Sequence, residues 1–202
     1  MSDEVAANDE DDGEFHSPFD LGFGHGALET FKWLIVGHLL YVVGLIVAMA
    51  LEIDRGNIWV TPLFGLPLLW AERKHRPWLR ALVFVVGFTA AHWLAVRFAV
   101  ESAGGDAMMT PGLVGGAVGA AISLVACAVL GLFRPGVPTL VLAACGIVLL
   151  AATGSFGVYM YLNSSGGTGG FTSEILRMLW IYTLWQVVFA YVLAKTLRPV
   201  RA

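Results

Sequence analysis

Long runs of uncharged, mostly apolar residues dominate this sequence. Trp33 to Leu51, Gly112 to Phe133 and Val137 to Leu162 contain no Asp, Glu, Lys or Arg. A helix needs about 20 apolar residues to cross a hydrocarbon core that is about 30 Å thick. The composition agrees, because 57% of the residues are hydrophobic and 13% are charged, against about 45–50% and about 25% in soluble domains. The sequence therefore predicts an all-α membrane protein.

Five of the apolar segments are long enough to span a membrane: residues 33–51, 81–100, 112–133, 137–162 and 174–194. A shorter uncharged segment, residues 56–71, contains Pro62, Gly65 and Pro67. Proline removes a backbone donor and interrupts a helix, and an unsatisfied backbone group is costly in lipid. We predict a bundle of six transmembrane helices if this segment is a short, kinked span. If the segment is a re-entrant hairpin, the bundle has five.

The basic residues predict the orientation in the membrane, because loops rich in Lys and Arg stay in the cytoplasm. They gather in one loop, in a turn and at the C-terminus: Arg73, Lys74, Arg76 and Arg80, then Arg134, then Lys195, Arg198 and Arg201. We therefore expect a cytoplasmic C-terminus in a plasma (inner) membrane. Six spans place the N-terminus in the cytoplasm too, and five place it outside. Lys32 beside the first helix, with only Arg55 on the far side, favours six.

The first 26 residues differ from the rest, since they hold eight acidic residues and no Lys or Arg. Such a self-repelling segment without hydrophobic periodicity is typical of disorder. We predict an acidic, largely disordered cytoplasmic tail over 1–26 and a helical transmembrane domain over 27–202. The whole chain has 12 Lys plus Arg against 15 Asp plus Glu. That balance leaves no basic surplus for nucleic acid.

Glycines spaced four apart mark the segment 112–133. Gly112 and Gly116 form one pair, and Gly115 and Gly119 form another. Small residues on one helix face let two helix backbones approach closely, which drives association in lipid. The motif predicts either packing against residues 137–162 of the same chain or a face for self-association.

Two histidines lie inside predicted spans, His38 in the first and His92 in the segment 81–100. Neutral imidazoles on separate helices could ligate a haem iron or the magnesium of a chlorin. Their predicted depths differ by about 9 Å at the helical rise per residue, which suits a single sandwiched haem poorly. The alternative is a structural role in which each histidine is hydrogen-bonded to a carbonyl of a neighbouring helix. No set of residues predicts another metal site.

Four charged residues lie near the predicted outer ends of two spans. Arg97 and Glu101 are four apart, and Glu174 and Arg177 are three apart, so each pair can interact along its own helix. One interpretation is that the side chains extend to the interface. The other is an anion-binding or gating cluster on a substrate or ion pathway, which requires the helices 81–100 and 174–194 to be adjacent.

Three function classes remain. The glycine motif and the scarcity of buried ionisable groups favour a subunit or scaffold of a membrane assembly, with other membrane proteins or a second copy as partner. The interrupted segment 56–71 favours a small-solute transporter or channel component. His38 and His92 favour a haem- or pigment-binding anchor. We expect no enzyme and no catalytic residues, because no nucleophile and base occur at a workable spacing.

Overall fold

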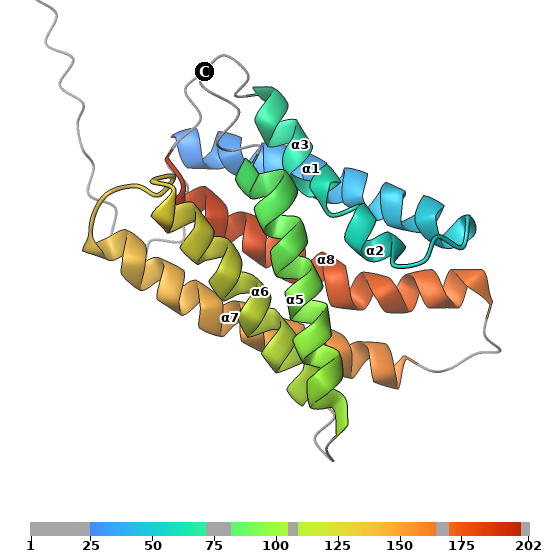
Figure 1. Ribbon diagram of the computed structural model, residues 1–202. Helices are drawn as coiled ribbons and strands as arrows, with labels where there is room; N and C mark the ends of the chain where they lie inside the picture. Colours follow the sequence, from blue (N-terminus) through green and yellow to red (C-terminus); the bar gives the residue numbers. More distant parts are fainter. Residues whose placement is uncertain (1–24, 72–81, 105–108, 165–169, 199–202) are drawn as a thin grey trace, which may run out of the picture.

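The computed structural model describes residues 25–71, 82–104, 109–164 and 170–198. These residues fold into helices (Figure 1): α1 (His25–Ala50), α2 (Gly56–Trp59), α3 (Pro62–Ala71), η1 (Leu82–Gly87), α5 (Phe88–Glu101), η2 (Ser102–Gly104), α6 (Thr110–Val129), α7 (Val137–Asn163) and α8 (Phe171–Thr196). Residues 1–24 of the predicted acidic tail lie outside the described residues. So do Arg201 and the basic loop with Arg73, Lys74, Arg76 and Arg80.

The prediction of an all-α membrane protein is confirmed. Five helical stretches are long and apolar enough to cross a membrane: Gly26–Ala50, Val83–Glu101, Thr110–Val129, Val137–Asn163 and Phe171–Thr196. They correspond to the five long segments expected from the sequence. The second of them begins with a π-helical turn, η1, which continues into α5.

Two helix boundaries differ from the prediction by several residues. The first helix begins at His25 and not at residue 33, because its opening turns tolerate charge: Lys32 and Glu29 are exposed and form an ion pair of 3.4 Å on one face. The helix predicted over residues 112–133 ends at Val129 and not at residue 133. The chain turns there at Gly131, whose φ of 68° suits glycine.

The segment 56–71 is a broken crossing. It forms the four-residue α2 and the ten-residue α3, with a break between them. The segment packs antiparallel along α1. The contacts run from Gly56 on Ala48, through Val60 and Leu63 on Gly44 and Phe64 on Gly37, to Trp70 beside Trp33. The chain therefore returns to the end of the bundle where α1 begins, as a kinked span does and a re-entrant hairpin does not.

The remaining helices complete an antiparallel bundle (Figure 1). His38 of α1 contacts Gln186 of α8, and Tyr41 contacts Tyr182, so the start of α1 lies level with the end of α8. Helices α6 and α7 form a tight hairpin, and α5 packs against α6. Between these layers the core is aromatic. Phe189 of α8 lies 5.3 Å from Phe88 and 6.0 Å from Phe64, measured between ring centroids.

The turn between α6 and α7 is tied to the end of α8. Phe133 and Leu197 form an isolated β-bridge. The side chain of Arg134 donates to the Leu197 carbonyl (2.9 Å), and that of Arg198 donates to the Phe133 carbonyl (3.1 Å). These bonds hold described basic residues at the end of the bundle where α1 starts. Whether that end faces the cytoplasm stays a prediction.

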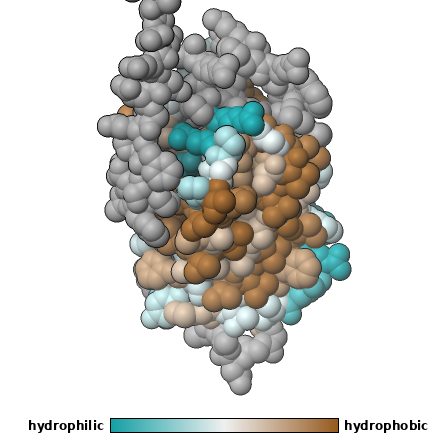
Figure 2. Space-filling model, turned by 90° about the vertical axis from the view of Figure 1, so that its left-hand side faces the viewer, coloured by the Kyte–Doolittle hydropathy of each residue, from teal (hydrophilic) through white to brown (hydrophobic). Residues whose placement is uncertain are grey.

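The outer surface is strongly apolar, as a lipid environment requires. Figure 2 shows an extended hydrophobic face with hydrophilic residues gathered towards its margins. Many large apolar side chains of the long helices are exposed, including Val129 (78%), Val148 (70%) and Val100 (68%). So much apolar surface would be unfavourable in water. The protein is therefore a multi-pass protein of a lipid bilayer.

Candidate functional site

Asn57, in the short helix α2, connects two other parts of the bundle. Its amide nitrogen Nδ2 donates to the hydroxyl of Tyr182 on α8 (2.9 Å) and lies 3.4 Å from Nε2 of His92 on α5. An amide NH₂ group only donates, so His92 accepts through Nε2 and is a neutral imidazole with its proton on Nδ1. The ring of His92 also lies 5.6 Å from that of Tyr182, between centroids.

The backbone around Asn57 is irregular, and this irregularity brings further polar groups to the same place. Arg55, directly before α2, has a left-handed backbone conformation with φ of 54°. The carbonyl of Asn57 accepts from the hydroxyl of Thr61 (3.2 Å) and from that of Tyr41 (3.5 Å). The break between α2 and α3 thus has its polar groups paired, as membrane depth demands.

A second buried contact lies one turn further along α8. Nδ1 of His38 and Oε1 of Gln186 are 2.7 Å apart, and both residues are at most 6% exposed. The amide oxygen only accepts, so the imidazole donates through Nδ1. We call the residues joined by these contacts the polar cluster; they are His38, Tyr41, Asn57, Thr61, His92, Tyr182 and Gln186.

The two histidines singled out from the sequence therefore both belong to the polar cluster. Each uses one ring nitrogen for a contact with an amide side chain: Nδ1 of His38 and Nε2 of His92. The structural alternative expected helix carbonyls as partners, and the structure places side-chain amides there instead. Haem or chlorin ligation stays a prediction, and only Nε2 of His38 and Nδ1 of His92 remain for it.

A half-open cavity of about 140 Å³ lies beside the polar cluster. Its wall is largely apolar and comes from five helices together with Thr61, just before α3. The lining residues are Thr61, Phe64, Phe88, His92, Ala95, Val96, Ala99, Pro111, Gly112, Gly115, Gly116, Gly119, Ser123, Gly154, Val158, Ile181, Tyr182, Trp185, Gln186 and Phe189. Polar groups reach the cavity mainly from α8, through Tyr182, Trp185 and Gln186.

The four glycines of the sequence motif lie on this cavity wall and serve packing within the chain. Gly112 and Gly116 face α7, where a Cβ at Gly116 would lie 2.5 Å from the Leu150 carbonyl oxygen. Gly115 and Gly119 face α5, where added Cβ atoms would lie 3.1 and 3.2 Å from alanine Cβ atoms. Both glycine pairs therefore allow close helix approach inside the molecule, and the space left between the helices is the cavity.

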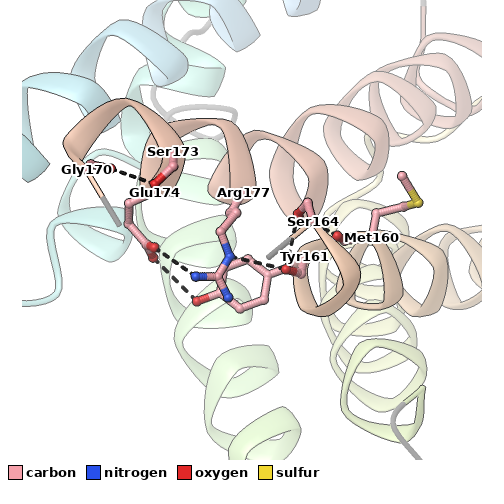
Figure 3. Close-up of polar contacts among 7 residues, drawn as sticks. All are labelled: Met160, Tyr161, Ser164, Gly170, Ser173, Glu174 and Arg177. Atoms are coloured by element: carbon pink, nitrogen blue, oxygen red, sulfur yellow. Dashed lines mark hydrogen bonds and ion pairs between the residues drawn. The ribbon is translucent and has the colours of Figure 1, made fainter. Parts of the chain in front are cut away.

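The two charged pairs lie elsewhere and stay separate. Arg97 and Glu101 are 2.9 Å apart on α5, with side chains 60% and 55% exposed. Glu174 and Arg177 are 3.3 Å apart at the start of α8 (Figure 3). Among the described ion pairs none joins Arg97 to Glu174 or Arg177 to Glu101, and none of the four residues lines the cavity.

The Glu174–Arg177 pair is built into the junction of α7 and α8. Arg177 donates through Nε to the Tyr161 carbonyl (3.2 Å), and its guanidinium lies 4.3 Å from the centroid of the Tyr161 ring. The Tyr161 hydroxyl contacts Glu174 at 3.4 Å (Figure 3). These contacts give the pair a structural role at the helix junction. Its role on a substrate or ion pathway stays a prediction.

Sequence reasoning missed Asn57, Tyr182, Trp185 and Gln186. Gln186 was open to detection, because a polar residue inside a membrane span is itself a functional signal. Asn57 was hidden, since it stands next to the charged turn before the segment 56–71 and read as part of a loop. Its role depends on the broken crossing, which brings it back against α5 and α8.

Comparison with protein-family models, with curated proteins and with solved structures finds no match to this chain. The polar cluster and the cavity are therefore the features of this chain from which a function can be inferred. Both lie among the helices and both involve α8, which supplies Tyr182 and Gln186 to each.

Proposed function

We propose that this protein binds a small, mostly apolar molecule inside the bilayer, as a component of a solute transporter. The observation that carries the proposal is the place of the cavity. A space of about 140 Å³ opens where a crossing is broken and where polar side chains from α5 and α8 meet.

Two features of the cavity support solute binding. Polar groups within a membrane are costly and mark ligand or ion pathways when they face a cavity. Irregular backbone at membrane depth is tolerated where it is buried in protein or lines a cavity, and discontinuous helices often carry the substrate sites of transporters. The irregular backbone at Thr61, between α2 and α3, lines the cavity. The Thr61 side chain also belongs to the polar cluster.

The second candidate function is that of a subunit or scaffold of a membrane assembly. It rested partly on the glycines of α6, and these glycines pack against α5 and α7 of the same chain. The observation that favours it is the large exposed apolar surface, which lipid alone also covers. Recovery of partner proteins in stoichiometric amounts in a mild-detergent pull-down would favour this function over solute transport.

We further propose that the protein is no enzyme and that both ends lie in the cytoplasm. The polar cluster is linked by neutral hydrogen bonds, and its side chains stabilise each other without an activated nucleophile. The orientation is supported by the gathering of Arg134, Lys195 and Arg198 near one end of the bundle, together with the positive-inside rule.

A variant that fills the cavity tests solute binding. Ala99 lines the cavity, while its neighbour Val100 is 68% exposed on the outside. We expect organic extracts of the purified protein and of Val100→Phe to contain the same enriched small molecule by mass spectrometry. Ala99→Phe should lack it, because its ring occupies the space. Equal extracts from all three proteins, or no enrichment in any of them, would contradict the proposal.

A further inference from the structure

The cavity offers a particular kind of hydrogen bond, and this narrows what it can hold. Three side chains on one face of α8, Tyr182, Trp185 and Gln186, contribute to its wall. Spacings of three and four residues place them within one turn of each other.

In two of these residues an oxygen already accepts a hydrogen bond while a donor remains. Oε1 of Gln186 accepts from His38, and the hydroxyl oxygen of Tyr182 accepts from Asn57. The amide NH₂ of Gln186 and the hydroxyl hydrogen of Tyr182 have no acceptor in the described part of the chain. His92, on the facing helix α5, accepts through Nε2 and keeps its proton on Nδ1.

Trp185 adds an independent observation. Its indole Nε1 is buried and lacks a hydrogen-bond partner in the described part of the chain. An indole nitrogen only donates, and an unpaired buried donor costs on the order of a lost hydrogen bond. Nε1 itself has almost no exposed area, so an acceptor in the cavity reaches this donor only when the indole ring turns, and the unpaired donor favours such a turn.

The remaining wall determines the other properties of the occupant. The described lining contains no Asp, Glu, Lys or Arg, so an ion would be buried without a counter-charge, at a high cost. Trp185 and Phe189 stack with ring centroids 4.8 Å apart and offer a flat aromatic surface. Apolar protein cavities of about 150 Å³ hold one benzene-sized ring, which matches the volume of about 140 Å³.

We infer that the cavity binds a neutral, ring-bearing lipophilic molecule with carbonyl oxygens, of the quinone or cyclic ketone class. Carbonyl oxygens only accept, which complements the donors of Gln186 and Trp185. The half-open side of the cavity lets a hydrocarbon tail extend into the lipid. This inference rests on the proposed function and names the substrate class of the same site.

Paired probes test the inference. The probes are 2-decyl-1,4-benzoquinone and decylbenzene, which have the same carbon skeleton. Both are tritiated, and their binding to the protein in lipid nanodiscs is measured by scintillation proximity. Empty nanodiscs give the background. We expect the quinone to saturate near one molecule per chain and to bind about tenfold more tightly than the hydrocarbon, because only the quinone accepts hydrogen bonds.

Variants identify the donors. Trp185→Phe and Gln186→Leu should each weaken quinone binding by about three- to tenfold more than they weaken hydrocarbon binding, because the hydrocarbon reports only the change in the shape of the cavity. Trp180→Phe is the matched control, because Trp180 lies on the same helix but is 42% exposed and lines no part of the cavity. It should bind like the unmodified protein.

The outcomes separate the two proposals. Equal affinity for quinone and hydrocarbon, or full quinone affinity in both donor variants, would overturn the carbonyl inference and leave solute binding in place. Binding of neither probe above empty nanodiscs would contradict both the inference and the proposed function.

Discussion

At the scale of single residues, this protein uses small and polar side chains for opposite purposes. The glycines of α6 let helix backbones approach closely, while Asn57, Tyr182 and Gln186 pair polar groups that lipid cannot hydrate. The sequence could predict the first use from spacing alone. It could not predict the second, because the partners of His38 and His92 are more than thirty residues away along the chain.

Gly112→Ala should destabilise the protein although alanine is the better helix former. An added Cβ would collide with the backbone carbonyl of Gly154 on α7, which cannot rotate away. We expect a loss of about 1–3 kcal/mol in the free energy of unfolding, measured by titration with a denaturing detergent. Leu113→Ala, at a 50% exposed neighbour, is the control and should change it less. A stabilised Gly112→Ala would refute close packing of α6 on α7.

The His38–Gln186 contact should appear as an energetic coupling. In a double-mutant cycle of His38→Leu and Gln186→Leu we expect a coupling of about 0.6 kcal/mol, the average for hydrogen bonds between membrane helices, and at most about 1.7 kcal/mol. The exposed Arg97–Glu101 pair, mutated to alanine in a parallel cycle, should couple by less than about 0.5 kcal/mol. A coupling of zero for the buried pair would mean that α1 and α8 do not meet there.

At the scale of elements, the broken crossing formed by α2 and α3 is the decisive feature. The prolines predicted an interruption, and the five long helices followed from hydropathy. The break lies directly before Pro62, whereas Pro67 lies inside α3. The path of the segment along α1 followed from neither signal, because it depends on contacts with Gly37 and Gly44. The sequence left two alternatives, a kinked span and a re-entrant hairpin. They place residue 71 on opposite sides of the membrane.

Single cysteines at the two ends of this segment distinguish the alternatives. In a background with Cys127 and Cys145 replaced by alanine, Asp54→Cys should react with a membrane-impermeant maleimide on intact cells. Ala71→Cys should react only after permeabilisation, since the segment has returned to the side where α1 begins. Asp54 is 95% exposed, so access does not limit the reaction. Labelling of both positions from the same side would establish a hairpin.

At the scale of the whole molecule, the helices leave a cavity where α5, α6, α7 and α8 meet near the break before α3. Only some of the site residues predicted from the sequence lie at this cavity. The glycines and His92 line the cavity and His38 contacts its wall through Gln186, whereas the two charged pairs lie apart from it. Charge near a helix end was visible in the sequence, but a space enclosed by five helices depends on packing that no single segment encodes.

The most direct test of the account is whether a small molecule can enter this cavity. Val158 of α7 lines it, while Ala143 of the same helix is 7% exposed and does not. In the background without native cysteines, Val158→Cys should react with methyl methanethiosulfonate in lipid nanodiscs, and Ala143→Cys should stay unmodified by mass spectrometry. Adding Ala99→Phe should protect Val158→Cys. An unreactive Val158→Cys, or equal modification at both positions, would contradict an accessible cavity.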